Sequence, residues 1–423
     1  MQIQIKSGIT LTVIPVSQFK NTQVSVHFLE HATKKTTSYR SLLANILETS
    51  SQKYENQILV SQELSRLYGA SFGTSVMRKQ TVHDLAFSLS LPNDHFLEKS
   101  DRLLDHGLDF LAEMIFHPLI KNSLFHEQTF QRQQINLVAY INALKDDKQS
   151  YAALQLQQLY FGKDEIQSTP TFGEADQIAQ ITNQDLFDYY KKVLAHDRIE
   201  IFVVGDVNAI QIQSIVQKWP LSERFDDNTD ISPLSYPEKQ IHQKTEVQSI
   251  VQSKLDLAYQ FPTNFRDSVY YAGIVFNALF GGSPLSKLFL NVREKASLAY
   301  YATSNVDVFN GLMIVQTGIN AADKEQVLAI VAQQLKDIQA GDFSEDHLAQ
   351  IKTGLTSNYI ASLDAERSYT SRALTNRLVD SQTSTKEWIA AIQKVSRSEI
   401  MAVAKQVHLT TSYFLSSEVK EHA

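Results

Sequence analysis

The chain contains two histidines and a glutamate at a spacing that could bind and use a metal ion. His27, Glu30 and His31 form the pattern H-x-x-E-H within the stretch VHFLEH. On a helix, residues four apart share one face, so two imidazoles can converge on one zinc ion. A glutamate beside them can then act as a general base on the metal-bound water. This chemistry requires residues 27–31 to be helical.

The residues around this motif predict a strand. Apolar residues alternate with other residues along 22–29, which is the period of an extended segment. With a rise of about 3.3 Å per residue, His27 and His31 would lie roughly 13 Å apart, too far to share one ion. Glu30 would also point to the opposite face of the strand. We therefore expect the end of a strand whose polar side chains face solvent, and an active zinc endopeptidase using these residues is the alternative.

The amino-acid composition limits the kinds of protein that this chain can be. The chain has 423 residues, 43% hydrophobic and 20% charged, with few glycines and prolines, which is typical of a folded protein of two or more domains. The net charge of −7 argues against a nucleic-acid partner. The absence of cysteine excludes disulfides and thiolate metal sites and fits a reducing compartment. Neither a leader-like segment nor a membrane-spanning apolar run is evident, so we predict a cytoplasmic protein without a membrane partner.

The same order of local signals closes both halves of the chain. Thr182 with Asp185 resembles a capping box, and Ser396 with Glu399 forms a second one. Each is followed by a helical stretch and then by a short strand. This recurrence predicts an internal duplication of two α/β units.

A polar stretch separates the two halves. Residues 221–248 carry two prolines and a run of acidic residues, as inter-domain linkers often do. We therefore expect an N-terminal domain over residues 1–220 and a C-terminal domain over residues 249–423.

One long motif in the second half resembles a known family. The stretch FGGSPLSKLFLNVREKASLAYYATS, residues 280–304, is similar to the second-domain signature of the pitrilysin/insulinase (M16) metallopeptidases. In the first half, ELSRLYGASFGT and FVVGDV also resemble this family, so the resemblance covers nearly the whole chain. It implies an α+β fold: a duplicated α/β roll in which each half has an antiparallel sheet with helices packed on one face.

The resemblance also implies where a zinc site would lie. In the family, the H-x-x-E-H motif is on the first long helix of the first domain, and the matching residues here read Asn45-Ile46-Leu47-Glu48-Thr49. Asn45 and Thr49 stand in place of the two histidines, and Glu48 alone is kept. The third ligand maps near Tyr140, and no acidic residue occurs between positions 127 and 146. We therefore predict no metal, no cofactor and no catalytic residue.

Two residues of the second half match the family's Arg–Tyr pair. By resemblance, Arg293 and Tyr300 would reach toward the peptide group of a substrate and bind it. The other interpretation is that Arg293 pairs with a nearby carboxylate and Tyr300 is an ordinary strand residue. Both interpretations stay open at this point.

The resemblance implies a function through a partner. The chain is similar to small bacterial M16-like proteins that occur in pairs, some associated with peptide processing and others with modification of elongation factor P. We therefore predict a catalytically inactive, non-catalytic subunit that binds a peptide or an unfolded polypeptide segment beside a paralogous zinc-bearing subunit. A homodimer is a further possibility, and a non-enzymatic binding or scaffold protein is a further alternative.

Overall fold

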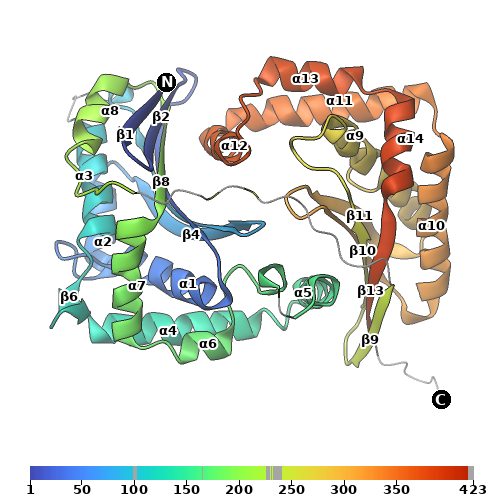
Figure 1. Cartoon of the computed structure of the whole chain (residues 1–423), viewed down its shortest axis with the longest axis horizontal. Helices are drawn as coiled ribbons and strands as arrows, with labels where there is room; N and C mark the ends of the chain where they lie inside the picture. Colours follow the sequence, from blue (N-terminus) through green and yellow to red (C-terminus); the bar gives the residue numbers. More distant parts are fainter. Residues whose placement is uncertain (99–101, 164, 225–228, 230, 232–240, 418–423) are drawn as a thin grey trace. The chain divides into compact units, whose positions relative to one another are not determined.

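The computed structural model describes residues 1–98, 102–163, 165–224, 229, 231 and 241–417. The chain forms two compact units, each built from separate stretches of sequence (Figure 1). Unit 1 comprises Met1–Ala143, Thr169–Ile231 and Leu363–Asp380, and unit 2 comprises the rest. None of the helices in the described part of the chain is both long and apolar enough to cross a membrane.

A six-stranded sheet organises unit 1. Every neighbouring pair of strands is antiparallel except β2 and β8, which are parallel. In order across the sheet, the strands are β1 (Gln2–Lys6), β2 (Ile9–Pro15), β8 (Arg198–Gly205), β3 (Asn21–His31), β5 (Val82–Pro92) and β4 (Ser71–Lys79).

One face of this sheet forms the larger core of unit 1. Val26 and Phe28 of β3 belong to that core, together with apolar residues from a group of helices. These helices are α1 (Lys34–Thr49), α2 (Gln57–Arg66), α3 (Leu103–Phe116), α4 (Glu127–Ala143), α6 (Ala175–Ala179), α7 (Asn183–His196) and α8 (Ala209–Val216). Successive side chains of a strand point to opposite faces, so Leu29 faces away from this core.

A single helix from the second half of the chain covers the opposite face. Leu374 and Leu378 of α12 (Glu366–Val379) pack with Leu29 and with residues of β5 and β8. The contact is also polar, because the Arg377 Nη2 atom lies 3.0 Å from Oε1 of the fully buried Glu200.

Unit 2 contains a five-stranded sheet with one parallel pair, β9 and β13. In order, its strands are β11 (Ala299–Asp307), β12 (Leu312–Ile319), β10 (Ser253–Gln260), β13 (His408–Ser417) and β9 (His242–Gln248). Its main core contains residues of α9 (Tyr270–Phe280), α10 (Lys324–Ala340), α11 (Glu345–Ala361), α13 (Thr385–Lys394) and α14 (Arg397–Gln406).

The other face of the unit 2 sheet is covered by a helix from the first half of the chain. Ala152 and Leu156 of α5 (Lys148–Phe161) are fully buried against Ala258 and Tyr413. The two units therefore share one arrangement. Most helices lie on one face of the sheet, and a helix from the other half of the sequence covers the second face.

The strand connections confirm the predicted duplication. Without β1, the order β2-β8-β3-β5-β4 of unit 1 corresponds strand for strand to β9-β13-β10-β12-β11 of unit 2. In each unit the first and last of these strands in sequence form the parallel pair, and the remaining neighbours are antiparallel. Helices α1 and α9 occupy equivalent places, after the second strand of each repeat.

The structure refines the predicted architecture in three respects. Each sheet is mixed and not purely antiparallel, and helices lie on both faces and not on one. The compact units also differ from the consecutive stretches 1–220 and 249–423, because α5 and α12 are exchanged. Of the expected linker 221–248, residues 225–228, 230 and 232–240 lie outside the described residues, while residues 242–248 form β9. That strand is exposed and polar because it lies at a sheet edge, so its composition resembles a linker.

A buried carboxyl group lies on the α5 side of the unit 2 sheet. Asp256 of β10 is fully buried, with Gln316 Nε2 3.4 Å from its Oδ2 atom. Burial raises the pKa of Asp256 to about 7, well above its ordinary value. The protonated form is therefore favoured in the folded protein at pH values where the unfolded chain has already lost this proton.

We predict that the exchanged helices stabilise the units in which they pack. Leu156→Ala should lower the free energy of unfolding by about 2–5 kcal/mol, because it leaves a cavity at a fully buried site. Native-state hydrogen exchange should then accelerate first in β10 and β13. The matched Leu374→Ala change should accelerate exchange in β3 and β8 instead; equal acceleration in both sheets for both variants would contradict the assignment.

We also predict a pH-dependent stability effect of Asp256. A raised folded-state pKa contributes stability at pH values below the unfolded pKa, and this contribution is lost as the pH rises through about 7. Asp256→Asn should therefore be more stable than wild type at pH 8, and the difference should shrink toward pH 5. Urea unfolding at several pH values measures it, with the exposed Asp342→Asn as control. A difference that is constant with pH would show that Asp256 is not the titrating group.

Candidate functional site

The H-x-x-E-H residues lie on strand β3, as predicted. His27 Nδ1 is 2.8 Å from Oδ2 of Asp84 on β5, whereas the exposed His31 bonds through Nδ1 to Thr81. The two imidazoles thus have separate partners, and the extended backbone of β3 excludes the alternative zinc site. The expectation that these polar side chains face solvent is wrong for His27, which is only 7% exposed. This face of the sheet is covered by α12, which periodicity within β3 does not reveal.

The Glu30 side chain lies on the sheet face opposite to His27, where its contacts stabilise the fold. Its Oε1 atom accepts a hydrogen bond from the Tyr189 hydroxyl at 2.6 Å and another from Arg40 Nε at 3.3 Å. Arg40, on α1, is completely buried and also pairs with Asp197 and donates to the Phe28 carbonyl at 2.7 Å. The glutamate of the apparent motif is therefore part of an internal ion cluster.

Helix α1 carries the positions where zinc ligands would be expected. Thr49 is buried, and its hydroxyl donates to the Ile46 carbonyl at 3.1 Å, while Asn45 is half-buried on the same helix. Tyr140 lies on α4 with 58% of its surface exposed. Among the residues that the structure describes, no group of three or more histidine, aspartate or glutamate side chains is placed to hold a metal ion.

Glu48 has a structural partner on the neighbouring strand. Its Oε2 atom accepts hydrogen bonds from the Thr74 backbone N–H at 2.9 Å and from the Thr74 hydroxyl at 2.6 Å. The same hydroxyl lies 3.1 Å from the Ala44 carbonyl of α1. Since β4 is the last strand of its sheet, this contact fixes the sheet edge to α1. These two hydrogen bonds give Glu48 a structural role that needs no metal-bound water.

Arg293 and Tyr300 line one cavity of about 470 Å³ in unit 2. The Arg293 guanidinium lies 4.7 Å from the centre of the Phe289 ring and 3.7 Å from Glu294 Oε1, and the side chain is 42% exposed. Tyr300 is the second residue of β11 and is 77% exposed. An exposed ion pair of this length contributes little to the free energy of folding, so Glu294 does not immobilise the Arg293 guanidinium.

An unusual local backbone brings these two residues to the same cavity. Phe289–Lys295 forms a π-helical segment, in which the Ala296 N–H bonds to the carbonyl of Asn291. π-helical turns are rare in proteins, but those that do occur are often found at functional sites. Ser297 then adopts a left-handed conformation with φ of 53°, which turns the chain into β11. The family-like motif that contains these residues does not by itself indicate this turn.

The remaining cavity wall was not anticipated from the sequence. Gln252 and Asn320 contribute polar side chains, and Ser297 lies between Arg293 and Tyr300. Gln252 precedes β10 and Asn320 follows β12, so tertiary pairing alone brings them to the cavity. No motif marks either residue.

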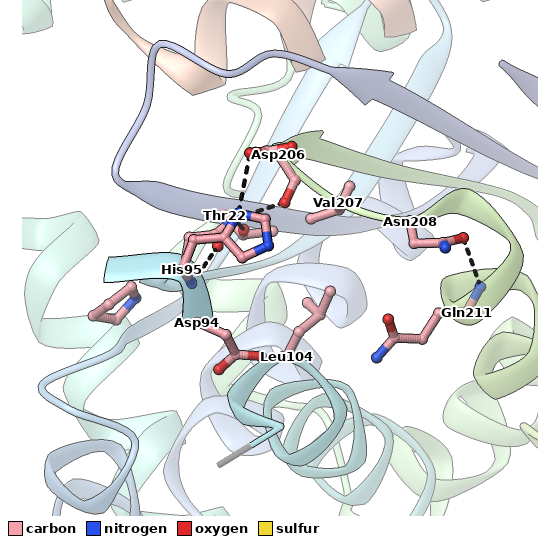
Figure 2. A pocket seen from close by; sticks show the side chains of 10 residues that line it. Thr22, Asp94, His95, Leu104, Asp206, Val207, Asn208 and Gln211 are labelled. Atoms are coloured by element: carbon pink, nitrogen blue, oxygen red, sulfur yellow. Dashed lines mark hydrogen bonds and ion pairs between the residues drawn. The ribbon is translucent and has the colours of Figure 1, made fainter. Parts of the chain in front are cut away.

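A second cavity, of about 380 Å³, lies in unit 1 near the ends of β5 and β8 (Figure 2). His95 Nδ1 is 3.2 Å from Asp206 Oδ2, and Asp94 accepts a hydrogen bond from the Leu103 N–H at 2.9 Å. Gln211 donates to Asp105 at 2.7 Å. Because these polar groups already have hydrogen-bond partners within unit 1, we take the Arg293 cavity as the better candidate.

A family model and similar sequences together match almost the whole chain. Residues 180–355 match the family model described as Peptidase M16 inactive domain. A Bacillus subtilis (strain 168) protein named probable inactive metalloprotease YmfF is 31% identical over 412 residues, 96% of each chain. An uncharacterized zinc protease of the same organism, YmxG, is 24% identical over 76% of this chain and 77% of its own.

Solved structures have a similar fold over the full length of this chain. A conserved protein from Enterococcus faecalis V583 is 39% identical, with a TM-score of 0.93 over 100% of this chain and 99% of its own. A peptidase M16 inactive domain from Pseudomonas fluorescens is 16% identical, with a TM-score of 0.81 over 100% and 99% of the two chains. At that identity the second likeness concerns the fold alone.

We predict that Glu48 acts in stability and not in chemistry. Glu48→Ala should lower the free energy of unfolding by about 1–3 kcal/mol, because the Thr74 N–H and hydroxyl lose their acceptor. Chemical denaturation measures the effect, with the exposed Glu55→Ala as a matched control. Equal stability of the two variants would show that the Thr74 contact contributes nothing.

Proposed function

We propose that this chain, which belongs to the M16 peptidase family and is a catalytically inactive member of it, is the non-catalytic subunit of a heteromeric peptide-binding complex. One observation carries the proposal. The zinc-ligand positions of α1 hold Asn45 and Thr49, while Arg293 and Tyr300 both line an open cavity in unit 2. The chain thus lacks the groups for hydrolysis but keeps groups that can bind a peptide.

The chemistry of the cavity suits a peptide backbone. A guanidinium offers five N–H donors, and a phenol offers one O–H donor. Peptide carbonyl oxygens accept such bonds, and a charged donor makes the stronger ones. The exposed Arg293 and Tyr300 side chains can therefore bind an extended peptide or an unfolded polypeptide segment without breaking an internal structural contact of comparable strength.

The partner we propose is a zinc-bearing paralogue in the cytoplasm. Two relatives of this chain come from one organism: the one named inactive, YmfF, and the one named a zinc protease, YmxG. An inactive and a zinc-bearing homologue can therefore occur in one cell, as a two-subunit enzyme requires. The absence of cysteine and the acidic net charge are compatible with a cytoplasmic site.

We predict that the Arg–Tyr pair acts on the partner's substrate. After co-expression with the paralogue, Arg293→Ala should weaken peptide binding about 10- to 100-fold, because a charge-assisted hydrogen bond is lost. Tyr300→Phe should weaken it about 3- to 10-fold, because only the hydroxyl is removed. Fluorescence anisotropy with labelled peptides measures binding, and a cleavage assay measures activity of the complex.

Controls separate the two parts of this proposal. Arg266→Ala removes another exposed arginine of unit 2 and should leave binding unchanged. If the paralogue does not co-purify with this chain, the heteromeric complex is wrong. If it co-purifies but neither variant alters binding or cleavage, the role assigned to the cavity is wrong.

A further inference from the structure

The outer edge of β9 differs from its counterpart in unit 1. In unit 1 the equivalent strand, β2, carries β1 on that edge in antiparallel pairing. In unit 2, β9 is the last strand of the sheet among the described residues. An unpaired edge presents a row of backbone N–H and C=O groups that another strand can bind. Among the described residues, no strand covers this edge in the way that β1 covers the edge of β2.

The side chains along β9 form an exposed, mixed surface. Val247 is 62% exposed and Ile241, just before the strand, is 54% exposed. Between them lie Lys244 and Glu246, with Lys244 Nζ 3.6 Å from Glu246 Oε2 and 3.2 Å from Gln155 Oε1. Glu246 also accepts hydrogen bonds from the Tyr151 and Tyr413 hydroxyls at 3.0 and 2.8 Å. The acidic group is thus held in place, and the strand presents one positive and one negative charge two residues apart.

We propose that β9 pairs antiparallel with β9 of a second copy of this chain, about a two-fold axis at Thr245. In this register each Lys244 lies opposite Glu246 of the other copy, and Thr245 lies opposite itself. Opposite charges and threonine pairs at directly facing positions stabilise a sheet. A two-fold contact requires one patch to be complementary to itself, and the order Lys-Thr-Glu meets that requirement.

The charges also select the register. Moving the axis by one residue places Lys244 opposite Lys244 in one direction and Glu246 opposite Glu246 in the other, and facing like charges are destabilising. A lysine on an edge strand normally discourages pairing. Here Lys244 already lies 3.6 Å from Glu246 of its own strand, and a correctly placed antiparallel copy adds a second, directly facing carboxylate. Because a seven-residue strand pair is small, we expect a weak dimer with a dissociation constant in the micromolar range.

Charge exchange tests the proposal on the full chain by sedimentation equilibrium across roughly 1–300 µM. Wild type should dimerise, and Lys244→Glu and Glu246→Lys should each raise the dissociation constant at least tenfold. An equimolar mixture of the two variants should restore a heterodimer, because every facing pair is then opposite in charge. Lys79→Glu, on the β4 edge, should leave the dimer unchanged. A monomeric wild type, or a dimer insensitive to Lys244→Glu, would overturn the proposal.

A cross-link tests the register without altering charge. The chain has no cysteine, so Thr245→Cys introduces a single thiol. Facing residues of an antiparallel pair have Cα atoms about 4.5–5.5 Å apart, within disulfide range. Mild oxidation should therefore give a covalent dimer much faster than for Ser65→Cys, an exposed control on α2. Equal rates for the two variants would overturn the register even if a Glu246 variant failed to fold.

Discussion

The completely buried Arg40 side chain is the constraint on which the arrangement of unit 1 depends. A buried guanidinium is stable only when its charge is compensated and its donors are bonded. Glu30 of β3, Asp197 after α7 and the Phe28 carbonyl meet that requirement together. Because all three groups must lie within hydrogen-bonding distance of the Arg40 guanidinium, α1 is fixed against β3 and α7. The helix that carries the zinc positions in this fold is thus held by an internal ion cluster, and its placement needs no metal.

A second constraint governs the division of the chain into units. Both faces of each sheet carry apolar residues, such as Phe28 and Leu29 of β3, which belong to different clusters. Each repeat supplies most of its helices to one face, and the second face must be covered by something else. Helices α12 and α5 meet this need reciprocally. Neither repeat, taken as a consecutive stretch of sequence, would bury both faces of its own sheet.

Local periodicity predicted the elements that carry the decisive positions. Alternation along β3 was enough to reject a helix at His27 and His31, and the capping boxes revealed the duplication. Contacts between distant elements could not be predicted. The burial of His27 depends on α12, the left-handed Ser297 carries no local signal, and β9 is polar because it is an exposed edge. These features are set by which surfaces meet in the folded protein.

The two candidate sites differ in whether their polar atoms are already bonded within the protein. At the α1 site, Glu48 binds Thr74, and the Thr49 hydroxyl binds the helix backbone. In unit 2, Arg293 and Tyr300 line a cavity, and the ion pair that Arg293 forms with Glu294 is long and exposed. A polar group that is bonded internally has no free energy to gain from a ligand unless it first loses that bond. The same comparison explains why we propose binding at the unit 2 cavity and a structural role for the helix that would hold zinc.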